Sequence, residues 1–310
     1  MKALAKKKKI WAGKRDDVVF YAVMAFLPLA QFFLMYICVN FNSLLMAFQD
    51  TNSAQSGGFT FDNIQNAFSF LISAEVLRLE GNSVLMMLLV AGIGTVLGLI
   101  FSFYIYKQYA LGNAFKVILY LPTIISAVVM GIIYTNFVGF AIPAYVEGLF
   151  GTEIPSLLDA KDPTTVFWTV IFFNIWIGFG SSVLLYSNSM SGISQEIVES
   201  SHLDGASGLQ EFWYISLPHV YPVMTTFIIT NIAGIFTNQF QVYTLIPSTK
   251  ADSVKTLGLY LFTETLDLSK SPSVVKYADL SAIGVLLTCV CVPLTFAVRW
   301  LMEKFGPSEE

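Results

Sequence analysis

The ionisable residues of this sequence, which could carry acid–base or nucleophilic chemistry, avoid its apolar segments. All 17 Lys and Arg residues and all 21 Asp and Glu residues fall outside the six apolar segments described below. The two histidines, His202 and His219, lie in or beside one polar loop. A hydrolase needs a base beside its nucleophile, and a proton-coupled carrier usually keeps an ionisable relay group at membrane depth. The pattern therefore disfavours both classes and favours a neutral solute, or energy supplied from outside the bilayer.

The sequence holds no signature of a nucleotide or metal site. It lacks the GxxxxGKS or GxxxxGKT pattern of a Walker A loop, so if ATP is the energy source, another subunit binds it. Gly92 and Gly94 imitate the start of a dinucleotide-binding fingerprint, but Gly94 and Gly98 form a GxxxG pair in an apolar segment, which favours close helix packing. The 3 cysteines include no CxxC pair. We therefore expect no metal, no cofactor and no enzymatic activity in this chain itself.

The composition indicates a membrane protein. Hydrophobic residues make up 55% of the chain and charged residues 12%, against about 25% charged residues in typical soluble domains. A helix needs about 20 mostly apolar residues to span the hydrocarbon core of a bilayer. The sequence thus predicts an all-α membrane protein with six transmembrane helices. The six segments are residues 18–39, 83–106, 117–138, 164–185, 220–243 and 280–298.

The distribution of Lys and Arg orients these helices. Most of the 17 positive charges lie in the N-terminal tail and in the segments that six spans place on the same side. Positive charge collects on the cytoplasmic side of a membrane. We therefore expect both termini in the cytoplasm, with a basic tail at residues 1–17, a transmembrane domain at residues 18–298 and a short tail at residues 299–310.

The loop at residues 187–218 is the most informative polar segment, and the same count places it in the cytoplasm. Ser194 can cap a short helix that carries acidic residues near its positive end. Gly205 breaks this helix, and residues 206–215 can form a second one before Pro218 opens the fifth span. Two short helices make a compact knob that suits docking into a groove of a partner protein.

The residues of this loop resemble the EAA motif of ABC importer permeases, which reads roughly E-A-A-x-x-D-G-A followed by F-x-x-I-x-L-P. Two further patterns, Leu121-Pro122 with Ile125-Ser126 and Trp176-x-Gly178, resemble the carbohydrate-uptake class, the kin of the maltose and glycerol-phosphate permeases. The resemblance covers most of the chain. The matching loop residues are Glu199, Ser200, Ser201, Asp204, Gly205 and Ala206, then Phe212, Ile215, Ser216, Leu217 and Pro218.

The loop departs from the family pattern in three positions and in its charge. Ser200 and Ser201 replace the two alanines of the motif, and Ser194 replaces a proline. Serine is small enough for the same packing, so docking should survive. The loop contains no Lys or Arg, and we hypothesise a complementary basic rim on the ATPase. Its acidic residues are Glu196, Glu199, Asp204 and Glu211.

The resemblance implies a mechanism of alternating access in the inner membrane of a bacterium. An extracellular solute-binding protein would deliver a sugar or oligosaccharide. Two ATP-binding subunits would close on ATP and pull on the coupling helices of this chain and of a second permease, which the class usually supplies as a different protein. Residues 199–206 would place the coupling helix. Membrane lipid completes the expected partners, and no basic domain suggests nucleic-acid binding.

Polar residues of the fourth and fifth spans are candidates for the solute pathway, because a sugar site needs amides and hydroxyls beside aromatic faces. Asn231 lies in the fifth span, and Asn238 and Gln239 fall in a stretch that resembles the asparagine-rich stretch of the maltose-type permease. Gly178 and Ser181 occupy positions that resemble those near the sugar in that permease. The same polar groups also suit helix packing alone.

Two other interpretations remain. The solute could be an amino acid, a phosphoester or an ion, although the uncharged spans mildly disfavour anions. A stand-alone secondary carrier should show inverted repeats or charge inside the membrane, and this sequence shows neither.

Overall fold

The computed structural model describes residues 2–50, 58–159, 161–246 and 253–307, with side chains from Asp17 onward. The lysines of the basic N-terminal tail lie outside the described side chains. The described residues form helices and turns, with one isolated antiparallel bridge between Gln49 and Phe59. The chain divides into two units, Met1–Ser69 with Ser273–Leu286, and Phe70–Pro272 with Leu287–Glu310.

The first unit is built around one long apolar helix. The first helix, α1 (Lys2–Gln31), continues through a π-helical stretch (Phe32–Cys38) into α2 (Val39–Ala47). The chain then turns toward α3 (Asp62–Leu71). The amide of Asn63 donates hydrogen bonds to the carbonyl oxygens of Ala47 (3.3 Å) and Gln49 (2.9 Å), which fixes the segment that follows α2.

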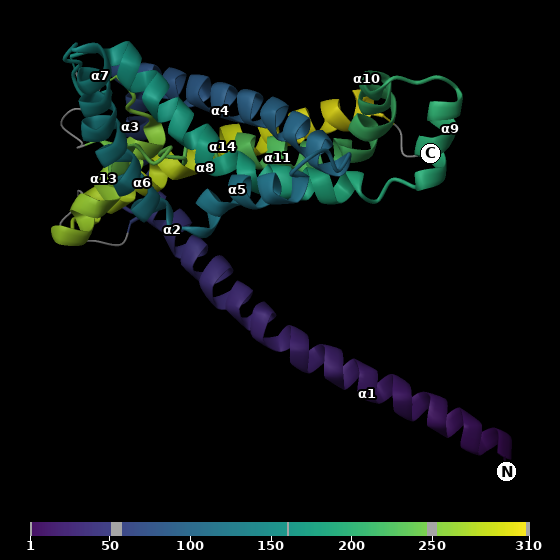
Figure 1. Ribbon diagram of the computed structural model, residues 1–310. Coiled ribbons are helices and arrows are strands. Elements are labelled where there is room, and N and C mark those ends of the chain that lie inside the picture. The colour runs from purple at the N-terminus through teal and green to yellow at the C-terminus, as the bar shows by residue number, and fades with distance from the viewer. Residues whose placement is uncertain (1, 51–57, 160, 247–252, 308–310) are drawn as a thin grey trace. The chain divides into compact units, whose positions relative to one another are not determined.

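The second unit contains the remaining helices, whose arrangement is visible in Figure 1. Helices α4, α5, α8 and α11 run side by side, α9 and α10 lie at one end of them, and α6, α7 and α13 lie at the other. Two π-helical stretches, Phe137–Ala141 and Phe212–Ser216, join α6 to α7 and α10 to α11. The helices are α4 (Ala74–Tyr106), α5 (Gly112–Ile124), α6 (Ala127–Asn136), α7 (Ile142–Phe150), α8 (Pro163–Met190), α9 (Gln195–Leu203), α10 (Gly208–Glu211), α11 (Leu217–Ala233), α12 (Val242–Leu245), α13 (Leu257–Lys270) and α14 (Val274–Phe305), of which α14 enters this unit from Leu287.

Five helices of the described chain are long and apolar enough to cross a membrane. Four of them coincide with the first, second, fourth and sixth segments expected from the sequence, which confirms a multi-pass helical protein. They are longer than expected because each helix continues past at least one end of its expected segment. The five are Asp17–Ala47, Ala74–Tyr106, Ala127–Phe150, Pro163–Met190 and Val274–Phe305.

The expected boundaries of the third span, residues 117–138, are wrong. The helix α5 ends at Ile124, Ile125 and Ser126 have extended backbone (ψ 142° and 132°), and α6 starts at Ala127. Pro122 lacks the N–H that would continue the hydrogen-bond ladder, and its ring crowds the preceding turn. The membrane-length helix therefore begins after this break and runs to Phe150.

The expected continuous fifth span, residues 220–243, is also wrong at its C-terminal end. Helix α11 has 17 residues and ends at Ala233. Residues 234–241 form turns in which Phe240 and Gln241 take left-handed backbone (φ 49° and 54°). Side chains satisfy this irregular backbone, because the Asn174 amide donates to the Phe240 carbonyl (2.8 Å) and the Asn238 carbonyl side chain accepts from the Phe240 N–H (2.8 Å). Non-helical backbone at membrane depth is tolerated where protein groups pair with it in this way.

Small residues allow α4, α5 and α8 to approach closely. A Cβ on Gly98 would lie 2.9 Å from Ser182 Oγ and 3.2 Å from the Tyr186 ring. The Ser102 hydroxyl donates to the Val183 carbonyl of α8 (3.0 Å). Gly98 thus has the packing role expected of the GxxxG pair, whereas a Cβ on Gly94 would meet nothing within 4 Å. Lipid supplies no hydrophobic force between helices, so such close packing and interhelical bonds hold them together.

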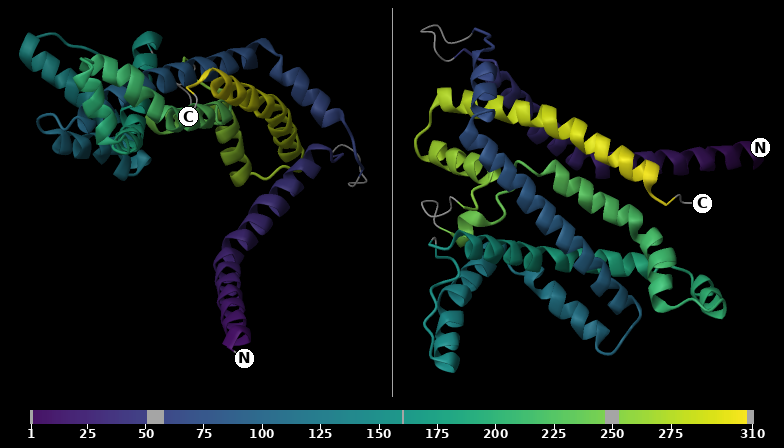
Figure 2. Two further views of the ribbon diagram at one scale, coloured as in Figure 1. Left: turned by 90° about the vertical axis from the view of Figure 1, so that its right-hand side faces the viewer. Right: turned by 90° about the horizontal axis from the view of Figure 1, so that it is seen from above.

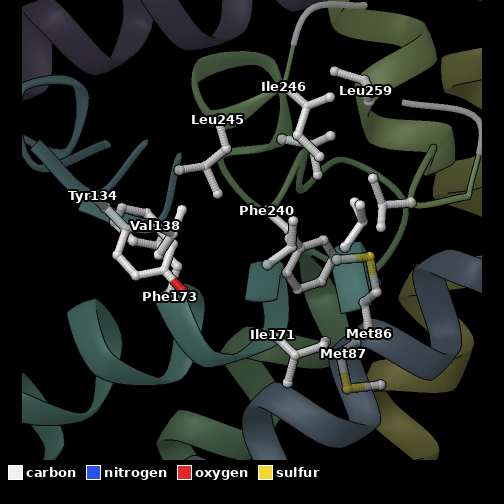
Figure 3. Close-up of a cluster of buried hydrophobic side chains, with 14 of the residues drawn as sticks. Met86, Met87, Tyr134, Val138, Ile171, Phe173, Phe240, Leu245, Ile246 and Leu259 are labelled. Atoms are coloured by element: carbon white, nitrogen blue, oxygen red, sulfur yellow. The ribbon is translucent and has the colours of Figure 1, made fainter. Parts of the chain in front are cut away.

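The larger apolar cluster lies at the end of the second unit opposite α9. Figure 3 shows Phe240 between side chains of α4 and α12, with Tyr134 and Phe173 packed against each other beside it. The Tyr134 and Phe173 rings have centroids 4.9 Å apart, and the Tyr134 hydroxyl donates to the Thr169 carbonyl (2.9 Å). The cluster therefore fixes the turn at residues 234–241 against α4, α6 and α8.

Candidate translocation pocket and coupling loop

A cavity of about 110 Å³, lined by polar and apolar side chains of the described residues, lies between α4, α8 and α11. No Lys, Arg, Asp, Glu or His side chain lines it, which agrees with the uncharged spans of the sequence. A neutral solute or water suits such a cavity, because ionised groups are costly at membrane depth. Its lining residues are Val90, Ala91, Gly94, Thr95, Asn174, Ile175, Gly178, Phe179, Ser182, Tyr186, Phe227 and Asn231.

One face of α8 supplies most of the polar lining. Asn174, Gly178, Ser182 and Tyr186 follow one another at intervals of four residues, which places them on one side of a helix. Because Gly178 and Gly94 carry no side chain and a Cβ on either would meet nothing within 4 Å, the cavity has room between α4 and α8.

The Tyr186 hydroxyl is the most unusual polar group of the cavity wall. It is buried, and among the described residues no partner meets hydrogen-bond geometry with it, although the Thr95 hydroxyl lies nearby. A hydroxyl in the cavity wall can donate a hydrogen bond to, or accept one from, a molecule that enters the cavity.

The residues expected on the solute pathway divide into two sets. Gly178 and Asn231 line the cavity. Ser181 is half-buried and outside its lining, whereas its neighbour Ser182 lines it. Asn238 bonds the turn after α11, and the Gln239 side-chain oxygen is buried without a partner in the described chain, but neither residue lines the cavity.

The sequence analysis missed Thr95, Ser182 and Tyr186 of the cavity wall. Ser182 and Tyr186 could have been identified from the sequence, because they continue the four-residue spacing of Asn174 and Gly178 along one face of a helix. Thr95 had no such signal, because its part in the wall depends on how closely α4 packs against α8.

The polar loop contains the expected short helix α9, whereas the expected second helix is the first turn, α10, of a helix that continues into α11. Helix α9 covers Gln195–Leu203, Gly205 has a left-handed backbone (φ 85°), and α10 follows at Gly208–Glu211. Figure 1 and the right-hand view of Figure 2 show α9 projecting beyond the ends of its neighbouring helices. Ser194 precedes α9 with extended backbone but makes no side-chain capping bond, and the second helix begins two residues later than expected, with a capping box between Ser207 and Gln210.

The motif residues of α9 and of the turn after it, Glu199 to Ala206, are exposed or half-buried. Glu199 is exposed and accepts a hydrogen bond from the Gln195 amide (2.9 Å). Ser200, Asp204 and Gly205 are exposed, and Ser201 and Ala206 are half-buried. Exposed apolar side chains accompany them, with Leu203 89% exposed and Ile197 51% exposed. This surface combines carboxylates with apolar side chains, which suits a protein partner.

Glu211 is not part of that acidic surface, and this corrects the expectation from the sequence. Its side chain is fully buried. Lys107, the residue directly after α4, donates to both of its carboxylate oxygens (2.9 and 2.8 Å). His202, in the last turn of α9, lies 2.9 Å from Glu211 Oε2 through its Nε2.

The electrostatics of this cluster favour the ionised carboxylate. Burial alone would raise the pKa of Glu211, but the hydrogen bonds and positive charges of His202 and Lys107 outweigh burial and hold the pKa below its usual value of 4.5. A carboxylate can only accept hydrogen bonds, so His202 must carry its proton on Nε2 to bond it.

Membrane-length helices around an uncharged cavity, with a knob of two short helices at one end, define a transport permease. The chain belongs to the family of binding-protein-dependent transport system inner membrane components, which it matches over residues 94–309. The family assignment confirms the resemblance seen in the sequence and makes the chain a transport subunit.

Individual relatives and solved structures agree with this assignment. The chain is 23% identical over 206 residues to the multiple sugar-binding transport system permease protein MsmF of Streptococcus mutans serotype c, covering 66% of this chain and 70% of that one. It is 28% identical over 157 residues to the maltose/maltodextrin transport system permease protein MalF of Klebsiella aerogenes, covering 50% of this chain and 30% of that one. A crystal structure of a bacterial ABC transporter involved in the import of the acidic polysaccharide alginate has the same fold, with a TM-score of 0.77, 20% identity, and coverage of 96% and 100% of the two chains.

Proposed function

We propose that this chain is a permease subunit of an ATP-driven ABC importer that carries a sugar or oligosaccharide across the inner membrane of a bacterium. The observation that carries the proposal is the uncharged cavity whose wall holds the Thr95, Ser182 and Tyr186 hydroxyls and the Asn231 amide. Sugars are recognised by hydroxyls and amides with aromatic faces beside them, and Asn231, Ser182 and Phe179 supply such groups here. The sugar-transport names of the relatives MsmF and MalF support the same class of solute.

The cavity is part of a larger pathway in this proposal. Its volume of about 110 Å³ is below the roughly 300–1,000 Å³ of typical ligand sites. The second permease, placed across the pathway, would supply the rest of the site, and alternating access would widen it.

The proposed topology has six transmembrane helices with both termini in the cytoplasm. The helix from Gly208 through Phe212–Ser216 to Ala233 is continuous. At about 1.5 Å per residue, its residues 212–233 are long enough to cross a hydrocarbon core of about 30 Å. These residues would be the sixth span, with Glu211 just outside it, and the turn at residues 234–241 would lie near the outer end of the span.

The proposed complex contains two ATPase subunits, which bind ATP and Mg²⁺, and an extracellular solute-binding protein. Helix α9 would dock into the ATPase through its exposed carboxylates and apolar side chains. Replacing Glu199→Lys should separate ATP hydrolysis from transport, because the reversed charge meets the proposed basic rim. Unchanged transport per ATP hydrolysed would contradict this docking.

The experiment that tests the function measures ATP hydrolysis by the whole complex in proteoliposomes. The chain is co-expressed with the permease, ATPase and binding protein encoded beside it, and a panel of sugars is added with the binding protein. Stimulation by one sugar supports the proposal and names the solute. Stimulation by an amino acid, a phosphoester or an ion instead would retain the permease and reject the sugar.

A further inference from the structure

The cluster of Lys107, Glu211 and His202 brings together three separate parts of the fold. Lys107 closes the α9 end of α4, Glu211 ends α10, and His202 belongs to the last turn of α9. Their side chains are 19%, 0% and 51% exposed. The cluster therefore reaches from the buried end of α4 to the exposed surface of the projecting helix.

The cluster is a far stronger contact than an ion pair on the surface. Exposed ion pairs contribute about 0–1 kcal/mol, and two ion pairs of the described chain, Lys270–Asp267 and Arg299–Glu303, are of this kind. Glu211 is different because its buried carboxylate needs its donors, and three N–H···O contacts of 2.8–2.9 Å supply them. Hydrogen bonds to a buried ion are short, directional and costly to break.

Helix α4 connects this cluster to the cavity. About one helical turn before Lys107, the Phe103 ring of α4 packs against the Phe212 ring, with centroids 5.2 Å apart. Leu99 and Gly98 follow on the same helix, and both contact the α8 region around Tyr186. Thr95 and Gly94 then line the cavity. Twelve residues separate Thr95 from Lys107, which is about 18 Å along a helix.

We propose that Lys107, Glu211 and His202 are positioning residues that fasten the coupling helix α9 to the end of α4, so that movement of α9 is passed to the cavity wall. The proposal rests on the proposed function for the meaning of that movement. His202 is the specific link to α9, because Glu211 and Lys107 join α4 to α10 without it. Helix α4 acts as the lever, since its tight packing against α8 allows little bending.

Changing His202 alone separates a role in positioning α9 from a role in the stability of the fold. Replacing His202→Ala leaves the buried Lys107–Glu211 pair intact, so the fold should persist. Replacing His202→Gln keeps an N–H donor of similar reach. Replacing Lys116→Met is a matched control, because Lys116 bonds Asn188 (3.0 Å) and does not touch α9.

The test has two measurements on the whole complex. The first is amide hydrogen exchange of residues 195–206 without nucleotide, which reports how firmly α9 is held. The second is solute transported per ATP hydrolysed in proteoliposomes. We expect His202→Ala to speed exchange and to lower transport per ATP about ten-fold, the factor for one hydrogen bond to a charged group. His202→Gln and Lys116→Met should remain within about two-fold of the wild type.

The outcomes separate this inference from the proposed function. Wild-type exchange in His202→Ala, or faster exchange with unchanged transport per ATP, would overturn the positioning role. If the wild-type complex carries no sugar, the sugar proposal fails. The exchange comparison then still decides whether His202 holds α9, and transport per ATP is measured with the solute that the panel identifies.

Discussion

The two polar regions of the second unit satisfy buried polar groups by different means. At the end that carries α9, a buried carboxylate is held by an ammonium group and an imidazole. In the cavity and in the turn at residues 234–241, neutral amides and hydroxyls bond the buried polar groups instead. For example, the Asn174 amide donates a hydrogen bond to the Phe240 carbonyl oxygen. The difference follows from the bilayer, because an ionised group is affordable near the aqueous boundary and costly at membrane depth.

The charged cluster and the cavity also differ in how rigidly their polar groups are held. The charged cluster has every carboxylate oxygen bonded and is suited to transmitting movement. The cavity retains a buried hydroxyl without a partner at Tyr186 and glycines at positions 94 and 178, so it is suited to receiving a variable molecule. Four predictions test this contrast, from the largest expected effect to the smallest.

Removing the lysine should be the most damaging change. Lys107→Met leaves the carboxylate of Glu211 buried with His202 as its remaining donor, and breaking a buried pair in this way costs about 3–5 kcal/mol. Unfolding of the detergent-solubilised protein by heat or denaturant measures this loss. Lys116→Met should change stability by less than about 1 kcal/mol. Equal stability of the two variants would contradict the contrast between buried and exposed lysines.

Removing a neutral donor should cost less. Asn174→Ala deletes the bonds to the Val170 and Phe240 carbonyls (2.9 and 2.8 Å), and we expect a loss of about 1–3 kcal/mol. The strained backbone at Phe240 should also become more accessible to hydrogen exchange. Asn136→Ala is the matched control, since Asn136 bonds only the Ile132 carbonyl of its own helix among the described contacts. Greater damage from Asn136→Ala would exclude the role given to Asn174.

Removing the Tyr186 hydroxyl should lower solute-stimulated ATP hydrolysis without lowering the stability of the protein. Tyr186→Phe eliminates a hydroxyl that makes no hydrogen bond of good geometry within the described chain, so stability should change by less than about 1 kcal/mol. Solute-stimulated ATP hydrolysis should fall several-fold, because the hydroxyl no longer bonds the solute. Tyr145→Phe alters a tyrosine that is 68% exposed and should change neither quantity. Full stimulation in Tyr186→Phe would remove this residue from the solute site.

The pH dependence of stability should be the smallest effect. The folded pKa of Glu211 lies below the usual 4.5, so its ionised form stabilises the fold fully above about pH 4.5 and this contribution is lost as the pH falls through the folded pKa. The difference in unfolding temperature between the wild type and Glu211→Gln should narrow as the pH falls below about 4.5. A difference in unfolding temperature that grows below about pH 4.5 would contradict a lowered pKa of Glu211 in the folded protein.

Local patterns predicted most of the helices and the polar loop. Four apolar segments became membrane-length helices, and Gly205 ended α9 through its left-handed backbone. The same patterns misplaced the third and fifth spans, because apolar residues continue across the break at Ile125 and Ser126 and across the turn at residues 234–241. Hydropathy measures the preference of residues for lipid and is insensitive to a local turn whose backbone is bonded by distant side chains.

The sequence by itself determined that the chain is a helical membrane protein with uncharged spans and a motif-bearing polar loop, because each of these properties resides in neighbouring residues. The tertiary structure decided which polar residues face the cavity and that Glu211 is buried. Lys107 and Glu211 lie 104 positions apart, and the Asn174 amide meets a carbonyl 66 positions away. Their roles exist only once α4, α8 and α11 have packed together, since packing alone brings the partners within bonding distance and removes the water that would otherwise replace them.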